Sequence, residues 1–275
     1  ASENAQNAEE QPKPPSLVTQ SIEGVGRSVI GTVEEVGHLV TLGVDVVRWG
    51  VRRPYRWQNL FFQLDFVGVG SVFIVLLTGL FTGMVFANQS ARAFAMFDAQ
   101  SLVGPTVALV LTRELAPVFS ALMVTMRAGS AMCTELGTMR VTEQVDAIRA
   151  LGADPLRKLV VPRVLACLLL MPALTILADV IGMLAGALVV NVQYGISFHL
   201  FFQGALDIVL MSDFLSGVFK GFVFGGIIGV VGCFKGLTVE GGTEGVGRAT
   251  TQTVAITSVA VCLADFFITK VTLSF

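Results

Sequence analysis

The chain has 275 residues, of which 53% are apolar and 14% are charged, whereas soluble domains carry about 25% charged residues. This composition excludes an ordinary soluble domain and indicates an integral membrane protein. The formal net charge of −2 favours no particular partner, and we expect no nucleic acid among the partners. Four dispersed cysteines without a CxxC pair predict small buried apolar residues, and two isolated histidines predict no metal site.

The N-terminal segment divides into two parts. Residues 1–16 are rich in Glu, Gln, Asn and Pro, which predicts a disordered polar tail. In residues 17–58 apolar residues recur every three or four positions, the period of one helix face. Charged residues interrupt this stripe, and its end mixes Arg with Trp and Tyr, as the headgroup layer favours. We predict an interfacial amphipathic helix; a helix packed on soluble protein is the alternative.

Residues 59–275 predict an all-α membrane domain with five transmembrane helices, since a span needs about 20 apolar residues. Fourteen Lys and Arg residues lie on one side of these spans and two on the other. The positive-inside rule therefore predicts a cytoplasmic N-terminus and an outer C-terminus. The expected spans are approximately 67–87, 102–126, 164–192, 214–234 and 249–268.

The second span carries Arg113 and Glu114 side by side, with Pro117 just beyond them. A charge at bilayer depth costs roughly 2.5–3.5 kcal/mol even on the lenient insertion scale. Adjacent helical residues point about 100° apart, so these two cannot pair squarely with each other. Each needs a different partner, which favours a ligand-facing role over a buried salt bridge that only fixes helix packing.

Three further charges lie within the other spans, namely Asp179, Lys220 and Asp265. For the two aspartates, structural pairing and a functional role remain equal alternatives. Lys220 can extend towards the headgroup layer or pair with one of the aspartates.

The fourth span repeats glycine at every fourth position, which leaves one helix face without side chains. Small residues at this spacing let another backbone approach closely. We predict a helix-packing face, within the protomer or across a dimer; general glycine enrichment of membrane helices is the alternative. Its residues are Gly217, Gly221, Gly225 and Gly229.

The loop between the second and third spans contains a short amphipathic segment at 142–151. Thr142 is the expected N-cap, and Glu143 is an acid in the first turn. Its polar face also carries Asp146 and Arg149. The predicted cytoplasmic helix either packs on its own spans or docks a soluble partner.

Several motifs in this order resemble the MlaE family of ABC-transporter permeases. They are TRELAPV at 112–118, RAGSA at 127–131, ELGTMRVTEQVDA at 135–147, DPLR at 154–157, GVGRATT at 245–251 and ADF at 264–266. The resemblance covers nearly all of residues 20–275. One departure is Ala116, where the family often has Gly.

The resemblance implies a homodimeric permease that moves phospholipid or a related lipid between the inner membrane and the outer envelope. It implies separate ATPase subunits that bind ATP and Mg, an MCE-type lipid-binding protein on the outer side, and room for an accessory STAS-type subunit. The helix at 142–151 would be the coupling helix. The implied coupling residues are Glu135, Arg140, Thr142, Glu143, Asp146 and Arg149, and the hypothetical lipid site is Arg113 with Glu114.

The residues themselves are consistent with a transport subunit that is not an enzyme. The chain contains no P-loop motif and no recognisable nucleophile arrangement, so any ATP hydrolysis belongs to another polypeptide. An ion-coupled secondary transporter and a non-transporting scaffold remain the alternatives, although five spans without an inverted repeat disfavour the former. The absence of a transit-like start favours a double-membraned bacterium over a chloroplast inner envelope.

Overall fold

The computed structural model describes residues 17–51 and 57–273, and within these ranges it contains helices and loops but no β-strand. The tail predicted at 1–16 lies outside the described residues, as do the basic and aromatic residues at 52–56. The elements, in which η denotes a short π- or 3₁₀-helical turn, are α1 Leu17–Val51, α2 Trp57–Leu64, η1 Asp65–Val69, α3 Gly70–Ala95, η2 Gln100–Leu102, α4 Val103–Val110, η3 Leu111–Leu115, α5 Ala116–Val124, η4 Thr125–Gly129, α6 Ser130–Val141, α7 Gln144–Ala150, η5 Leu156–Val160, α8 Val161–Tyr194, α9 Phe198–Ile208, α10 Met211–Leu237 and α11 Gly242–Leu273.

Five continuous helical stretches in the described part of the chain are long and apolar enough to cross a membrane. Each predicted span lies inside one of them, because helices continue beyond the apolar segment that sequence counting detects. The all-α membrane fold with five spans is therefore confirmed. The stretches are Gln58–Ala95, Gln100–Val141, Leu156–Tyr194, Met211–Leu237 and Gly242–Thr272.

Helix α1 contributes to two compact units, residues 1–41 and 42–275. In the first unit, Val33, Val36 and Val40 on the apolar stripe are more than half exposed. In the second unit, the end of α1 inserts Val46 into a buried cluster with Val160 of η5 and with residues of α6, α8 and α10. The interfacial role of α1 stays a prediction.

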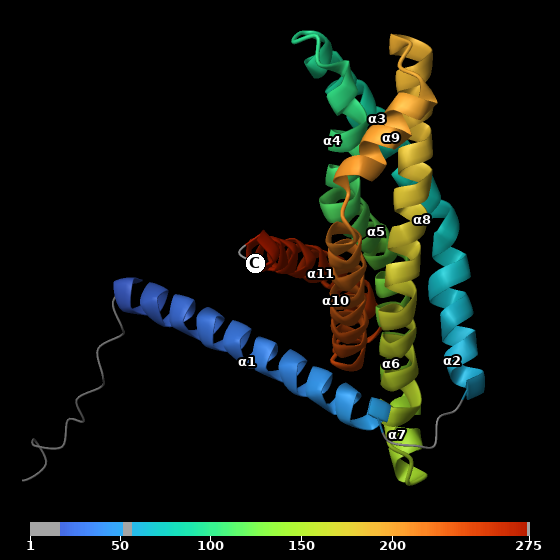
Figure 1. Cartoon of the computed structure of the whole chain (residues 1–275). Coiled ribbons are helices and arrows are strands. Elements are labelled where there is room, and N and C mark those ends of the chain that lie inside the picture. The colour runs from blue at the N-terminus through green and yellow to red at the C-terminus, as the bar shows by residue number, and fades with distance from the viewer. Residues whose placement is uncertain (1–16, 52–56, 274–275) are drawn as a thin grey trace, which may run out of the picture. The chain divides into compact units, whose positions relative to one another are not determined.

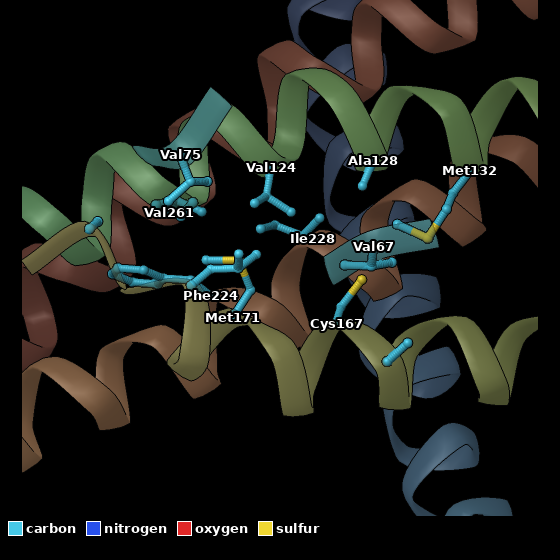
Figure 2. Close-up of a cluster of buried hydrophobic side chains, with 14 of the residues drawn as sticks. Val67, Val75, Val124, Ala128, Met132, Cys167, Met171, Phe224, Ile228 and Val261 are labelled. Carbon is cyan, nitrogen blue, oxygen red and sulfur yellow. The ribbon is translucent and has the colours of Figure 1, made fainter. Parts of the chain in front are cut away.

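The core of the second unit forms where α8 runs beside α3 and α10 (Figure 1). Small residues allow these approaches, because a Cβ at Gly83 would fall on the backbone of Gly182. Figure 2 shows side chains from α3, α5, α8, α10 and α11 meeting in one apolar cluster that includes Met171, Phe224 and Ile228. This packing fixes the positions of the spans along their axes and so determines which charged residues on neighbouring spans face each other.

Outside the predicted site regions, two details differ from the sequence-based expectations. Helix α9 lies between the third and fourth spans, where no helix was predicted; Ser197 caps it by accepting a hydrogen bond from the Leu200 amide at 3.2 Å. Cys262 is exposed on α11, so the expectation of a buried residue is wrong there, because the fifth span has few neighbours. The other three cysteines are buried as expected.

Candidate functional site

The charged pair Arg113 and Glu114 lies on η3, a π-helical turn within the second span. Single π turns inside α-helices are frequent at functional sites. Pro117 has no amide hydrogen, so it cannot donate to the carbonyl of Arg113 four residues earlier. The Nζ atom of Lys220 donates to this carbonyl at 2.8 Å, and a side chain from another span thus replaces the missing backbone donor.

Lys220 on α10 is the centre of the site. Its ammonium donates hydrogen bonds to Glu114 Oε2 at 2.6 Å and to Thr269 Oγ1 at 2.7 Å, in addition to the Arg113 carbonyl. These three bonds use all three N–H groups of a lysine. Asp265 Oδ1 lies 2.8 Å from Nζ and completes an ion pair without a further hydrogen bond. Three spans are thereby joined at one buried cation.

Two glycines of α10 bring Lys220 to this position. A Cβ at Gly217 would collide with the carbonyl oxygen of Thr112, which lies on η3. A Cβ at Gly221 would lie 2.9 Å from Thr175 Oγ1 on α8. Because both lack side chains, α10 approaches η3 and α8 closely enough for the lysine between them to reach Glu114.

The remaining members of the predicted glycine face lie against α8 of the same chain. A Cβ at Gly225 would meet the carbonyl of Cys167, and one at Gly229 would lie 2.9 Å from the Cα of Val164. The glycine row thus faces other helices of this chain along its length.

Arg113 contacts α10 at a second point. Its Nε lies 3.6 Å from Oδ1 of Asp213, and Oδ2 of the same carboxylate accepts the amide hydrogen of Leu210 at 3.0 Å. Asp213 therefore anchors the first turn of α10 and faces the guanidinium at the same time. Among the described residues, no group forms a hydrogen bond with the guanidinium of Arg113.

Asp179 is not joined to this cluster by a contact among the described residues. It is buried on α8, and its Oδ1 has no hydrogen-bond partner there. The structure therefore connects Lys220 and Asp265 with the pair on η3 but leaves Asp179 apart.

The second predicted region, around α7, is built differently. Thr142 does not cap α7; it ends α6, and its hydroxyl donates to the Thr138 carbonyl at 2.8 Å. Glu143 has φ 59°, in the left-handed region, and α7 begins only at Gln144. The prediction of Thr142 as N-cap is wrong, because α6 continues to Val141 and Glu143 occupies the position before α7.

The polar residues of this region pair mostly with each other. Asp146 accepts hydrogen bonds from Arg140 at 2.7 and 2.8 Å and lies 3.4 Å from Arg149. Glu135 instead pairs at 2.7 Å with Arg163, a buried residue of α8. The chain segments before and after α7 are thus joined by the Glu135–Arg163 ion pair.

Sequence reasoning missed Asp213 and Thr269. Asp213 is an acid in the first turn of a helix, which is a detectable signal. Thr269 lies four residues after Asp265 and therefore on the same helix face.

A third missed residue, Arg127, lies outside this cluster and connects the second span to the first. Its guanidinium donates hydrogen bonds to the Phe66 carbonyl and to Ser71. Gly70 makes room for its guanidinium.

Comparison with known proteins places the chain among membrane permeases. The family model described as permease MlaE matches residues 60–271. The chain is 43% identical to "Probable ABC transporter permease protein slr1045" of Synechocystis sp. over 77% of this chain and 80% of that protein. A protein of Rickettsia bellii, also named as a probable ABC transporter permease, is 36% identical over 90% of this chain and 95% of its own length.

A plant relative is similar over a comparable part of the chain. The Arabidopsis thaliana protein named TRIGALACTOSYLDIACYLGLYCEROL 1, chloroplastic, is 40% identical over 78% of this chain and 61% of its own length. The relatives thus include bacterial and chloroplast proteins. With five membrane-spanning helices and a family match over most of its length, the chain belongs to the MlaE permease family and is a transmembrane permease subunit.

Proposed function

We propose that this permease carries phospholipid between the inner membrane and the outer envelope of a double-membraned bacterium. The observation that supports this most directly is the charged cluster at η3. Arg113 and Glu114 are partly exposed within a spanning helix, and the terminal guanidinium nitrogens have no hydrogen-bond partner among the described residues. A guanidinium can bind a phosphate through two parallel hydrogen bonds. A phospholipid joins such a phosphate to apolar chains, which the surrounding spans can accommodate.

The proposal includes the assembly that the family implies. Two copies of the chain would form the permease, with a cytoplasmic N-terminus and the C-terminus on the outer side. Separate P-loop subunits would bind ATP and Mg, an MCE-type protein would receive or deliver lipid on the outer side, and a STAS-type subunit would be accessory. Relatives named as ABC transporter permeases support an ATPase partner.

The ATPase would dock on the end of the bundle that carries α7. Glu143 is exposed there at the junction between α6 and α7. A hollow of about 280 Å³ between the end of α10 and the start of α11 opens at the same end, since Val239, which lines it, packs near Val141 at the end of α6. Glu240, Glu244 and Arg248 line this hollow with charge.

Photocrosslinking tests the lipid site. A photoreactive amino acid at position 113 or 114 in cells with labelled lipid should capture phospholipid. Position 73 on α3, where Phe73 is largely exposed, is the positive control for contact with bulk lipid. Capture at position 73 without capture at 113 or 114 would show that the pair is structural and would overturn the proposal.

Substitution of Arg113 separates charge from geometry. Arg113→Ala should reduce lipid transport while the complex still assembles, because with the described residues the guanidinium forms one loose ion pair and no hydrogen bond. Arg113→Lys should restore transport only partly, because an ammonium cannot form the bidentate pair. Full activity of Arg113→Ala would contradict a phosphate-binding role.

A further inference from the structure

The cluster at η3 carries more negative than positive charge. Glu114, Asp213 and Asp265 contribute three carboxylates, whereas Arg113 and Lys220 contribute two cations. One formal negative charge is therefore left over among the described residues of the cluster. Inside the spans such an excess is weakly screened, so it affects which headgroup can bind.

The two cations differ in what they can offer a ligand. Lys220 is 1% exposed, and its three N–H groups are already used by oxygens of the chain. Arg113 is 22% exposed, approaches Asp213 most closely through Nε at 3.6 Å, and has no hydrogen-bond partner for its terminal nitrogens among the described residues. A phosphate can therefore bind at Arg113 but not at Lys220.

The accessible acceptors are carboxylates. Glu114 is 33% exposed and Asp265 is 21% exposed. Oδ1 of Asp265 is the carboxylate oxygen closest to Lys220, and neither oxygen of Asp265 has a hydrogen-bond partner among the described residues. Lys220 holds both carboxylates at one point, so together they can accept hydrogen bonds from a ligand ammonium group.

We propose that this site selects zwitterionic phospholipids that carry a protonated primary amine over anionic phospholipids with the same acyl chains. The headgroup phosphate binds the terminal nitrogens of Arg113, and the headgroup ammonium donates to Glu114 and Asp265. Such a lipid adds no net charge to the site, whereas an anionic lipid would add a second uncompensated negative charge. A quaternary choline group binds more weakly than a primary amine, because it has no N–H to donate. This inference rests on the proposed lipid site.

A competition experiment tests the selectivity on the assembled wild-type complex. The complex is reconstituted in vesicles that contain equal amounts of phosphatidylethanolamine and phosphatidylglycerol with the same photoactivatable acyl chain, and crosslinked peptides from η3 and α11 are quantified. We expect about a tenfold excess of captured amine lipid over anionic lipid. The excess is modest because water screens much of the Coulomb difference between the two headgroups at partly exposed groups. A phosphatidylcholine probe should fall between the two.

Variants identify the residue responsible. Asp265→Asn removes the excess negative charge and should bring the two probes close to equal capture. Asp207→Asn, an exposed change on α9 outside the cluster, should leave the ratio unchanged. Glu114→Gln provides a second test of the same charge if Asp265→Asn does not assemble.

The outcomes separate this inference from the proposed function. Equal capture of both lipids by the wild-type complex, or an excess of the anionic probe, overturns the selectivity and leaves the lipid site standing. Capture of neither probe at η3 and α11, with capture at exposed Phe73, overturns the lipid site itself.

Discussion

Two groups of charged residues in this permease use the same chemistry in opposite ways. At η3, Lys220 pairs with Glu114, which is 106 residues away in the chain, and the lysine is buried among three spans. At α7, Arg140 pairs with Asp146 only six residues away, and both side chains are substantially exposed. The first group joins distant helices, whereas the second shapes one local turn.

Burial determines what each group contributes. A buried ion pair gives little net stability over an apolar packing, but removal of one partner leaves an uncompensated charge. An exposed pair is screened by water and contributes little in either direction. The η3 cluster is therefore sensitive to loss of its buried cation Lys220, whereas the α7 surface is free to vary its charges and to exchange internal pairs for contacts with another protein.

The largest effect is expected for Lys220→Met. The substitution leaves Glu114 and Asp265 without their cation and leaves the Arg113 carbonyl without its donor. We expect a loss of about 3–5 kcal/mol, the range for breaking a buried pair. Thermal unfolding of the detergent-solubilised complex, followed by size-exclusion chromatography, measures this loss.

The exposed Arg248, which pairs with Glu244, provides the control for Lys220. Arg248→Met should leave the melting temperature nearly unchanged. Addition of Glu114→Gln and Asp265→Asn to Lys220→Met should recover part of the lost stability, because no charge then remains unpaired at Lys220. If Lys220→Met melts like the wild type, the lysine does not join these spans.

A smaller loss of stability is expected for a substitution on the face of α10 that packs against α8. In Gly225→Ala the new methyl group would fall on the carbonyl of Cys167, so the helices must separate. Overpacking of this kind costs about 1–3 kcal/mol. In Gly226→Ala the methyl group would lie 3.3 Å from Leu168 Cδ2, the end of a flexible side chain that can move. Melting of these neighbouring variants at the same temperature would contradict close packing at Gly225.

Much of this architecture could be predicted from the sequence. Apolar segments separated by polar loops identify five spans, because each span must be long enough to cross the hydrocarbon layer. The cost of charge in that layer also identified Arg113, Glu114, Lys220 and Asp265 as residues that need partners.

Pairing of Lys220 with Asp179 or Asp265 was one of two alternatives from the sequence, and the structure has the pair with Asp265. The choice between the aspartates and the pairs of Lys220 with Glu114 and of Arg113 with Asp213 could not be predicted, because apolar counting leaves the relative depth of two spans open by about a turn. The π turn at η3 further changes the direction of the side chains that follow it. Pro117 did offer a neglected signal, since it leaves the Arg113 carbonyl without a helical donor. At α7 the left-handed conformation of Glu143 could not be foreseen, because Thr142 followed by an acid is typical of a helix start.

Asp146→Asn should have a small effect on stability. It weakens contacts with Arg140 and Arg149, but these side chains remain hydrated. We expect a loss of at most about 1 kcal/mol, as for exposed pairs in general. The same melting assay applies. A loss as large as that of Lys220→Met would show that the α7 pairs are structural, and the contrast between the two regions would then fail.

The smallest change in stability is expected for Glu143→Lys. Its effect should be confined to association with the ATPase subunit. Lysine can replace glutamate at this exposed junction without a new clash, so the free energy of unfolding should change by less than about 0.5 kcal/mol. The altered charge should nevertheless weaken binding of the ATPase subunit, which co-purification and lipid-stimulated ATP turnover measure. Asp207→Lys is the matched control, because it makes the same type of change at the other end of the second span. Asp207 lies on α9, which packs on α4 at the start of that span, whereas α7 follows its end. Normal association of both variants would remove Glu143 from the docking surface, whereas loss in Glu143→Lys alone would place the ATPase at the α7 end of the bundle.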